Sequence, residues 1–454
     1  MKLLSTEIAA YVGGRAQGAE VLCESVSIDS RTLSPGALFV AIRGEHADGH
    51  AFLESAIARG ARAALVERAT PGSVPTIQVA DTRKALAELA QAWRARFDIP
   101  VVGVTGSNGK TTVKGMLASI LGQMGPGTAT AGNLNNDLGV PLTLLRMQSG
   151  DRFAVVEMGM NHAGEIAVLT RWSRPTVAVI TNAAAAHLEG LGSVAAVAQA
   201  KGEIFSGLAQ SGTAVINAAD PYQGLWRDLA AGRRIVTFGA AGADVSGNSE
   251  IQGSGQRIDI TLSPALGGGR VRAQLALLGR HNLANALAAT AAAVAAGATL
   301  EQVRAGLEVM RPVPGRLAPV QAAQGGLILD DTYNANPGSV RAAIEVLRAF
   351  PAPRILILGD MLELGSESQE QHAAVGHEAR AAGIEKLLAV GPAMAAAVAA
   401  FGSGGQHFAD VDALAGALDA YAGEGVTLLV KGSRGMRMER VVQRLAPHSP
   451  GEVH

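Results

Sequence analysis

The stretch Val101–Thr112 (VVGVTGSNGKTT) decides the fold, because it joins an apolar run to a helical pattern through a glycine turn. Val101–Val104 predicts a buried strand, Gly106–Gly109 a tight turn, and the residues from Thr111 to about Leu121 a helix. Glycine lets the backbone curl so that amide groups point at phosphate oxygens, and a helix N-terminus adds its positive end. The sequence therefore predicts a cradle for a nucleoside triphosphate.

The turn is shorter than the usual phosphate loop. The spacing GxxxxGK[ST] would put its first glycine where Val104 stands, and what remains is GxxGK[ST]. We expect Lys110 to reach the β and γ phosphates and the Thr111 hydroxyl to bind Mg²⁺. The alternative is a glycine-rich strand-to-helix turn with a chance lysine. The predicted ATP-binding residues of the turn are Gly106, Ser107, Asn108, Gly109, Lys110, Thr111 and Thr112.

Length and composition exclude several classes of protein. The 454 residues suffice for about three domains. Basic and acidic residues, 38 and 39, nearly cancel, which argues against a nucleic-acid or anionic membrane partner. Cys23 is the only cysteine, so no internal disulfide forms and a reducing compartment is favoured. Glu7 interrupts any signal peptide, and the alanine-rich stretch 283–298 is too short to span a membrane. We expect a cytoplasmic monomer without membrane insertion.

The chain divides into three regimes of pattern. Residues 1–84 hold short apolar runs broken by turns, which predicts a small α/β unit. Residues 85–311 and 312–454 each alternate apolar strands with helices, and strands without polar alternation are typical of a parallel sheet buried on both faces. An antiparallel excursion is expected between 245 and 278, and Met310–Arg316 (MRPVPGR) is interpreted as a linker. The expected strands are Val101–Val104, Phe153–Glu157, Thr176–Thr181, Gly212–Asn217, Ile235–Phe238, Leu327–Asp330, Arg354–Leu358, Leu387–Val390 and Val426–Val430.

Three further residues are candidates for a metal site. Glu157 ends a strand predicted to share an edge with the glycine turn, where a carboxylate can hold Mg²⁺ against phosphates, or can simply face water. His187 follows a buried strand, and a lone histidine is as often structural as a ligand. Nothing in the local pattern separates Lys201 from a solvated lysine.

Taken in order, these segments resemble the Mur ligases, which form amide bonds with ATP during peptidoglycan precursor synthesis. The resemblance rests on TGSNGKTT, the strand ending at Glu157, AAAAHLEGLGS (183–193), QAKGEIF (199–205) and GRHNLAN (279–285). It implies an α/β fold of three domains: a small amino-terminal α/β domain, a central P-loop-type doubly wound, mostly parallel sheet, and a carboxy-terminal Rossmann-like domain.

The resemblance also assigns roles. It implies that Lys201 is carbamylated by CO₂ and helps to hold a second Mg²⁺ together with Glu157 and His187. Thr111 completes the predicted metal set. Lys110, His187 and Lys201 are the expected catalytic residues, and Asn282 is expected to contact the adenine side of ATP.

Within the family, GNLNNDLGVP (132–141), EMGMNHAGE (157–165) and DDTYNANP (330–337) look like the member that adds D-alanyl-D-alanine. IDSR (28–31) looks like part of its UDP-sugar-binding domain. From the residues alone, Arg31 also suits a surface ion pair, the asparagines suit Asx turns, and Lys431 and Arg434 suit a helix start. The expected substrate-binding residues are Ser30, Arg31, Asn133, Asn135, Asn136, Lys431 and Arg434, and ATP contacts from the last domain are expected at Arg316, Asp331, Tyr333 and Asn334.

The resemblance implies ATP and Mg²⁺ as cofactors and UDP-MurNAc-tripeptide and D-Ala-D-Ala as substrates. The expected reaction passes through an acyl phosphate to a pentapeptide. The third residue of the tripeptide, lysine or diaminopimelate, stays open, as does the base that deprotonates the attacking amine. Two other classes remain: a P-loop regulatory protein that reports nucleotide binding to a partner, and a small-molecule kinase.

Overall fold

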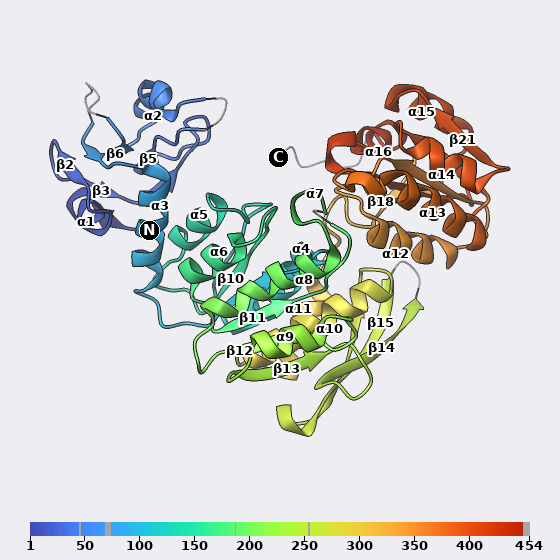
Figure 1. The fold of residues 1–454 in the computed structure, drawn as a ribbon, viewed down its shortest axis with the longest axis horizontal. Coiled ribbons are helices and arrows are strands. Elements are labelled where there is room, and N and C mark those ends of the chain that lie inside the picture. Colours follow the sequence, from blue (N-terminus) through green and yellow to red (C-terminus); the bar gives the residue numbers. More distant parts are fainter. Residues whose placement is uncertain (45–46, 69–73, 187, 253–254, 448–454) are drawn as a thin grey trace.

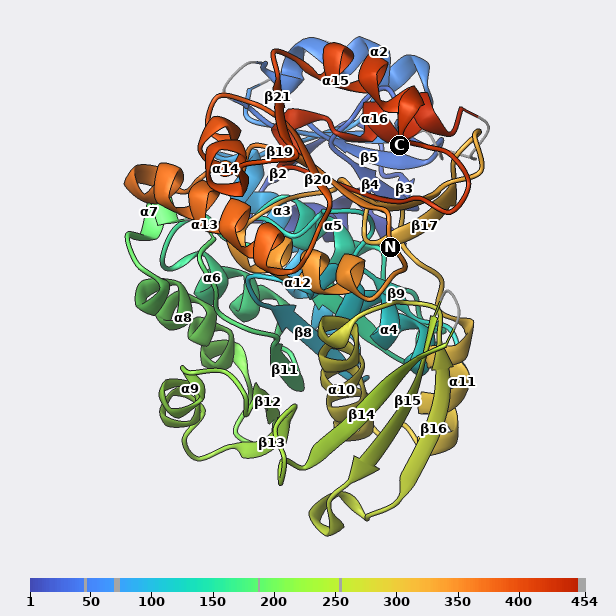
Figure 2. The same cartoon turned by 90° about the vertical axis from the view of Figure 1, so that its right-hand side faces the viewer.

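A computed structural model describes residues 1–454 except 45–46, 69–73, 187, 253–254 and 448–454. Within the described residues the strands form four sheets, distributed over three units of the chain. Figure 1 shows the amino-terminal unit (blue) and the carboxy-terminal unit (red) at opposite ends of the central unit (green to yellow), both on the same side of it. Figure 2 shows the same outer units stacked over the central one.

The amino-terminal unit is built on a five-stranded sheet in the order β2-β7-β6-β5-β4, and in the described residues only β2 runs antiparallel to its neighbour. Its middle strands, β5 and β6, are buried at every position because they are entirely apolar. The expected boundary at residue 84 falls inside α3, which Asp81 caps by accepting the Arg83 and Lys84 amides. The elements are β1 (Leu3–Leu4), α1 (Ser5–Tyr11), β2 (Arg15–Gln17), β3 (Leu22–Cys23), β4 (Ser25–Ser27), β5 (Ala37–Val40), η1 (Gly49–Phe52), α2 (Leu53–Ala58), β6 (Ala63–Val66), β7 (Thr76–Gln78) and α3 (Thr82–Arg94).

The central sheet has the order β16-β15-β14-β13-β12-β11-β8-β10-β9 in the described residues, with β8 between β10 and β11. The five strands expected here are confirmed, and so is the antiparallel excursion, which forms β14–β16. Neighbouring residues of β8 enter different cores, Val101 on one face and Val102 on the other, as a strand buried on both faces requires. The strands are β8 (Val101–Thr105), β9 (Thr128–Ala129), β10 (Ala154–Glu157), β11 (Val177–Ile180), β12 (Thr213–Asn217), β13 (Arg234–Phe238), β14 (Val245–Gln252), β15 (Gly255–Leu262) and β16 (Arg270–Leu275).

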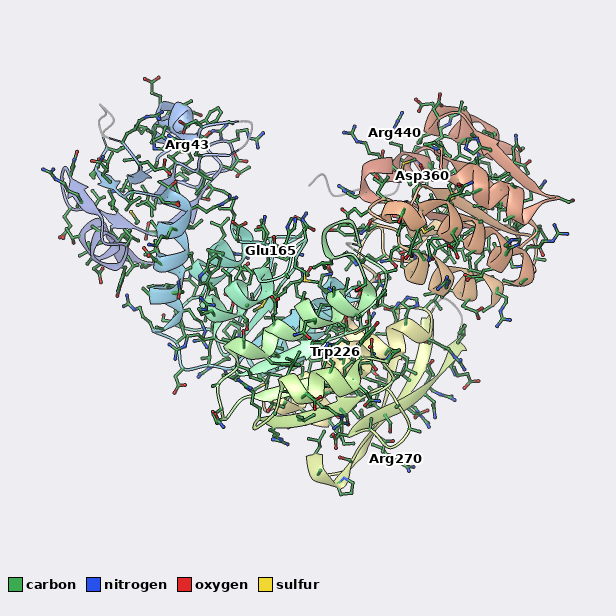
Figure 3. All side chains as sticks on the ribbon, viewed as in Figure 1. Arg43, Glu165, Trp226, Arg270, Asp360 and Arg440 are labelled. Carbon is green, nitrogen blue, oxygen red and sulfur yellow. The ribbon has the colours of Figure 1, made fainter. Side chains whose placement is uncertain are left out.

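Helices cover both faces of this sheet. On one face α10, rich in alanine, packs closely on α4. On the other, Trp226 (Figure 3) donates from Nε1 to the Ala198 carbonyl at 2.9 Å and so ties α9 to α8. Thr299 and Gln302 form a capping box at the start of α11. The helices are α4 (Lys110–Leu121), η2 (Gly122–Met124), α5 (Gly139–Leu145), α6 (Glu165–Ser173), α7 (Leu188–Leu191), α8 (Val194–Gly202), η3 (Glu203–Gly207), α9 (Gln223–Leu229), η4 (Pro264–Leu266), α10 (Arg280–Ala295) and α11 (Leu300–Val309).

The carboxy-terminal unit is a six-stranded sheet in the order β17-β18-β22-β19-β20-β21, and among its described strands only β17 is antiparallel. Its four expected strands are confirmed, whereas β17 and β21 were not expected. Among the described residues, no helix is long and apolar enough to cross a lipid bilayer. The elements are β17 (Ala318–Gln321), β18 (Leu327–Asp331), α12 (Pro337–Arg348), β19 (Arg354–Gly359), η5 (Gly365–Glu367), α13 (Ser368–Ala381), β20 (Lys386–Val390), α14 (Met394–Phe401), β21 (Gly405–Phe408), α15 (Val411–Ala417), η6 (Leu418–Ala420), β22 (Thr427–Lys431), η7 (Arg434–Met436) and α16 (Glu439–Leu445).

Candidate active site

The glycine turn between β8 and α4 lies where the sequence places it. Gly109 has φ of +81° and precedes the first residue of α4, and Gly106 has φ of +149°. A Cβ at Gly106 would lie 1.8 Å from the Thr181 Oγ1, and one at Gly109 would lie 2.3 Å from the Asn285 Oδ1. Both positions therefore require glycine for conformation and for space.

The end of β11 holds this turn in shape. Thr181 Oγ1 donates to the Asn108 carbonyl at 2.6 Å, and Asn182 Oδ1 accepts from the Asn108 amide at 2.9 Å. The Ser107 amide donates to the Asn182 carbonyl at 2.9 Å. A loop tied at this many backbone groups is pre-organised, so a phosphate meets it with little ordering left to complete.

Lys110, the first residue of α4, folds back over the turn and donates from Nζ to the Gly106 carbonyl at 2.7 Å. Burial lowers the pKa of its amine; the nearby Glu157 carboxylate opposes that effect and the charge of Arg316 adds to it. The next residue, Thr111, donates from Oγ1 to the Glu157 Oε1 at 3.3 Å. The charged end of the turn and the carboxylate therefore belong to one site.

Glu157 is buried at the end of β10, next to β8, with its Cα opposite that of Val104. Burial alone would raise the pKa of this carboxyl, but the charges of Lys114 and Lys110 and a hydrogen bond from Asn135 hold it below its ordinary value. Lys114 Nζ lies 3.2 Å from Oε2, and Asn135 Nδ2 donates to Oε1 at 2.9 Å. Glu157 is thus an ionised carboxylate inside a cationic site.

These oxygens fit a hard divalent cation such as Mg²⁺. The Thr111 hydroxyl and the Glu157 carboxylate lie side by side, and Glu157 Oε2 is buried with the Lys114 ammonium 3.2 Å away but without a hydrogen bond of regular geometry among the described residues. Among all residues that the structure describes, no cluster of three or more His, Cys, Asp or Glu side chains is suited to a metal. His187, the expected third ligand, lies outside the described residues, so the predicted metal set stays a prediction.

Lys201 lies on α8 and is only 1 % exposed. Burial, with a smaller contribution from the charge of Lys110, lowers the pKa of its amine well below the ordinary lysine value. Burial therefore favours the neutral, nucleophilic form of this amine over the charged form that a solvated lysine adopts. The solvated lysine that the sequence alone allowed is therefore wrong.

A cavity of about 640 Å³ lies between the central and carboxy-terminal units. It brings together most of the residues that the sequence nominates from both units. Ser30, Arg31, Gly106 and Lys201 are not among its lining residues. The nominated residues that line it are Ser107, Asn108, Gly109, Lys110, Thr111, Thr112, Asn133, Asn135, Asn136, Glu157, Asn282, Arg316, Asp331, Tyr333, Asn334, Lys431 and Arg434.

At the start of α10 the cavity is bordered by amide and imidazole groups. Asn282 donates from Nδ2 to the Leu278 carbonyl at 2.8 Å and accepts on Oδ1 from Asn285 Nδ2 at 3.0 Å. Burial, together with the charge of Lys431, lowers the pKa of the neighbouring His281 to about 4. This wall of the cavity is neutral and polar, which suits the edge of a base better than a phosphate.

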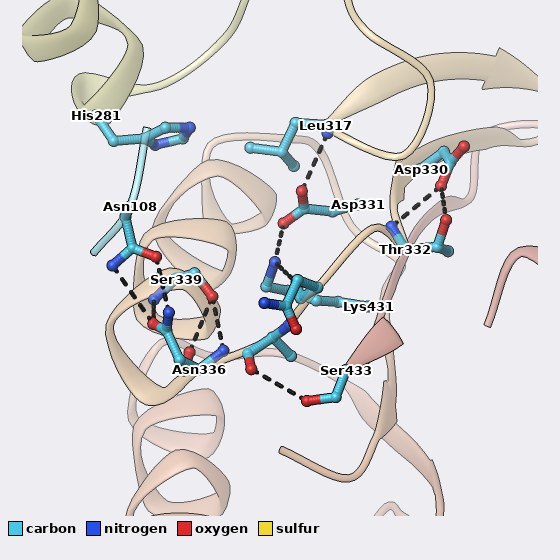
Figure 4. Close-up of polar contacts among 12 residues, drawn as sticks. Asn108, His281, Leu317, Asp330, Asp331, Thr332, Asn336, Ser339, Lys431 and Ser433 are labelled. Carbon is cyan, nitrogen blue, oxygen red and sulfur yellow. Dashed lines mark hydrogen bonds and ion pairs between the residues drawn. The ribbon is translucent and has the colours of Figure 1, made fainter. Parts of the chain in front are cut away.

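The carboxy-terminal wall is built from the ends of β18 and β22. Asp331 and Lys431 form a buried ion pair, with Nζ 2.7 Å from Oδ2, and Lys431 also donates to the Asn334 carbonyl at 2.7 Å (Figure 4). The Arg316 guanidinium lies 4.1 Å from the Tyr333 ring centroid and donates from Nη2 to the Thr111 Oγ1 at 2.9 Å. Its Nε has no hydrogen-bond partner among the described residues. Arg316 therefore reaches the glycine turn Gly106–Gly109, called the phosphate turn below, from the other unit, and its buried Nε is left unsatisfied.

Sequence reasoning missed several contributors. Lys114 pairs with Glu157, Thr181 and Asn182 hydrogen-bond the glycine turn, and Asn336 meets this turn from the carboxy-terminal unit. Asn336 precedes Pro337 at the start of α12, a sequence signal for a helix cap that says nothing about a partner 228 residues away.

Ser30 and Arg31, the two residues nominated in the amino-terminal unit, do not line the cavity. Arg31 pairs with Asp29 at 2.8 Å while its side chain is 84 % exposed, which is the surface ion pair that the residue pattern allowed. Ser30 is buried, at 7 % exposure. Their predicted contact with a nucleotide sugar stays a prediction.

Comparisons with known proteins give a consistent result. Residues 23–94 match the model "Mur ligase family, catalytic domain", residues 104–293 match "Mur ligase middle domain", and residues 315–434 match "Mur ligase, glutamate ligase domain". The chain is 46 % identical to the UDP-N-acetylmuramoyl-tripeptide--D-alanyl-D-alanine ligase of Escherichia coli over 97 % of each chain. A crystal structure of MurF from Acinetobacter baumannii matches with a TM-score of 0.91 at 33 % identity, covering 98 % of this chain and 99 % of that one. MurF from Thermotoga maritima in complex with ADP matches with a TM-score of 0.81 at 28 % identity, over 93 % and 96 % of the two chains.

Proposed function

The chain belongs to the Mur ligase family, and from that premise we propose that it joins D-alanyl-D-alanine to UDP-N-acetylmuramoyl-tripeptide with ATP. The product is the UDP-MurNAc-pentapeptide precursor of peptidoglycan. The observation that carries this proposal is one cavity lined both by the phosphate turn and by the strand end at Asp331, Tyr333 and Asn334. Because the reaction consumes ATP and a UDP-linked substrate, we place it in the cytoplasm. We also propose that the chain has three domains, divided near residues 84 and 311.

ATP is needed because a carboxylate is a poor acyl donor, whose leaving group would be oxide. The terminal carboxylate of the tripeptide attacks the γ-phosphorus in line with departing ADP and gives an acyl phosphate. The neutral amine of D-Ala-D-Ala then attacks the acyl carbon, and phosphate leaves from the tetrahedral intermediate. The amine passes its proton to a base, and we assign this role to no described residue.

Lys110 and Arg316 suit the phosphoryl-transfer step. Lys110 releases the Gly106 carbonyl and turns its charge to the β and γ phosphates, and the backbone amides at the start of α4 hold the same oxygens. Arg316 brings its planar guanidinium from the other unit and keeps its stacking contact with Tyr333. Charge on the transferring group thus meets cationic donors from both units.

The chemistry of the donors supports Mg²⁺ held by Thr111 and Glu157, with His187 and a carbamylated Lys201 as further ligands. Burial favours the neutral form of the Lys201 amine; that form adds to CO₂, forming an N–C bond, and loses one N–H proton to give a carboxylate-like carbamate. Bound there, Mg²⁺ supplies a positive charge that offsets repulsion between the triphosphate and the incoming carboxylate.

The remaining nominated residues serve the substrates in this proposal. Asn133, Asn135 and Asn136 hydrogen-bond the sugar and peptide, and Ser30 and Arg31 hold the nucleotide-sugar end. Lys431 and Arg434 bind a substrate carboxylate, with Lys431 shared between that group and Asp331. An acyl phosphate hydrolyses in water, so placement of the cavity between two units gives the means to enclose it.

The test uses the purified protein with ATP, Mg²⁺, D-Ala-D-Ala and a UDP-tripeptide carrying lysine or diaminopimelate. ADP release that requires both substrates, with a pentapeptide seen by mass spectrometry, is the expected result. ATP turnover that is indifferent to either substrate contradicts the proposal. Tight nucleotide binding without substrate-dependent turnover indicates a regulatory protein, and a phosphorylated product without an amide indicates a kinase.

A further inference from the structure

Lys114 lies one helical turn beyond Lys110 on α4, and it is only 7 % exposed. It is not among the residues that line the cavity. Its Nζ donates to the Gly132 carbonyl at 2.9 Å and lies 3.2 Å from the Glu157 Oε2. A buried ammonium is unfavourable unless it is paired and hydrogen-bonded, and these two partners meet that need.

The two partners come from segments with different tasks. Glu157 ends β10, beside the phosphate turn, whereas Gly132 begins the loop 132–136 that carries the nominated substrate asparagines. The loop and the carboxylate also touch directly, because Asn135 Nδ2 donates to the Glu157 Oε1 at 2.9 Å. The Gly159 amide donates to the Asn135 carbonyl at 2.8 Å and fixes the loop from its other side.

The two oxygens of Glu157 are thereby divided. Oε1 faces Asn135 and Thr111, the side of the phosphate turn, and Oε2 faces Lys114. An apolar residue at 114 would leave the Gly132 carbonyl without this donor and the carboxylate without this cation. A lysine is suited to both partners at once, because its compact ammonium has three donors on a flexible stem.

From this arrangement we propose that Lys114 is a positioning residue that holds loop 132–136 and the Glu157 carboxylate against α4. The nucleotide-sugar peptide bound by the loop is thereby held in line with ATP. The inference rests on the proposed function, since it takes loop 132–136 as the binding site of that substrate. Lys114 acts through its neighbours and touches neither substrate.

The experiment measures UDP-tripeptide binding by calorimetry in the presence of a non-hydrolysable ATP analogue, because ATP is expected to bind first, and then steady-state kinetics. Lys114→Met keeps the length of the side chain and removes both its charge and its donors. We expect its Kd for UDP-tripeptide to rise about tenfold or more, its kcat to fall, and its Kd for ATP to stay within about twofold of that of the wild type. Lys84→Met, on an exposed lysine of α3, is the matched control and should leave all three values unchanged.

Two further variants guard against misfolding of Lys114→Met. Lys114→Gln retains a donor for Gly132 without the charge, and Lys114→Arg retains both in another shape. We expect each to bind UDP-tripeptide more weakly than the wild type and more tightly than Lys114→Met. If all folded variants lose thermal stability but keep the wild-type Kd and KM for UDP-tripeptide, the inference is overturned while pentapeptide formation stands. Wild-type protein that binds no UDP-tripeptide overturns the proposed function and the inference with it.

Discussion

Asn336 donates from Nδ2 to the Asn108 Oδ1 at 2.8 Å, across 228 residues of sequence, and Asn108 returns a longer contact of 3.5 Å (Figure 4). One partner belongs to the phosphate turn and the other caps α12 of the carboxy-terminal unit. The hydrogen bonds between these two side-chain amides link the carboxy-terminal unit directly to the phosphate turn. Arg316 and Thr111 make a second contact between the same two parts.

Asn336→Ser should separate the contact from the cap. Serine caps a helix about as well as asparagine but is too short to reach Asn108, so the variant should lose only the stability that this hydrogen bond contributes, about 0.5–1.5 kcal/mol. Loss of one hydrogen bond, about 0.5–1.5 kcal/mol, should lower kcat/KM for ATP about two- to tenfold. Kinetics and thermal melting check both expectations. Asn336→Ala should lose the cap as well and melt earlier, whereas an unchanged kcat/KM in the serine variant would show that the contact has no part in nucleotide use.

The buried pair Asp331–Lys431 predicts a strongly non-additive double-mutant cycle. Lys431→Met should lower the free energy of unfolding by less than the roughly 3–5 kcal/mol of a fully buried pair, because Asp331 keeps some exposure and burial already raises its pKa, so that it takes up a proton. Adding Asp331→Asn should recover part of that loss. Denaturant unfolding of the two single variants and the double variant measures the coupling. Additive losses would mean that the two charges do not depend on each other.

His281 makes the free energy of unfolding depend on pH. Its pKa lies at about 4 in the fold, below the ordinary histidine value of 6.5, so the unfolded chain binds the proton more readily. The contribution of His281 to stability is therefore fully present above pH 6.5 and is lost as the pH falls toward 4. Between these limits, unfolding free energy should fall with acidity less steeply in His281→Gln than in the wild type. Equal slopes for the two proteins would contradict the neutral, buried imidazole.

The carbamate on Lys201 has a chemical test. Lys201→Ala should lower kcat at least about a hundredfold, because several kcal/mol of charge stabilisation depend on an ordered metal site. Acetate, a small carboxylate, should restore part of the activity, and removal of CO₂ and bicarbonate should lower the activity of the wild type. Lys84→Met, exposed on α3 and with Lys201 intact, serves as the control: acetate should not raise its activity, and removal of CO₂ and bicarbonate should lower it as in the wild type. Full activity of the alanine variant without acetate would refute the role.

Much of this architecture could be predicted from local sequence. Val101–Val104 and the other apolar runs predict buried parallel strands, and the pattern of glycines before Lys110 predicts the turn, because both signals lie within a few residues of the structure they produce. The short edge strands β17 and β21 were not expected. Edge strands bury less of their surface, so their sequences carry a weaker apolar signal.

Contacts between distant segments were harder to anticipate. Lys114 has the local pattern of an ordinary helical lysine, and only the register of β10 beside β8 brings Glu157 to it. Arg31 shows the opposite case, since its partner Asp29 lies two residues away and the surface ion pair could be foreseen from the sequence. Burial separates Lys201 from a solvated lysine, and burial is a property of the assembled sheet and helices.

The fate of one oxygen atom tests the central claim most directly. UDP-tripeptide labelled with ¹⁸O in its terminal carboxylate is incubated with the protein, ATP, Mg²⁺ and D-Ala-D-Ala, and the released phosphate is analysed by mass spectrometry. Attack of that carboxylate on the γ-phosphorus predicts one labelled oxygen in each phosphate and one retained in the new amide carbonyl. Pentapeptide formed together with unlabelled phosphate would contradict the acyl phosphate, and with it the account of why this cavity gathers cations around Glu157.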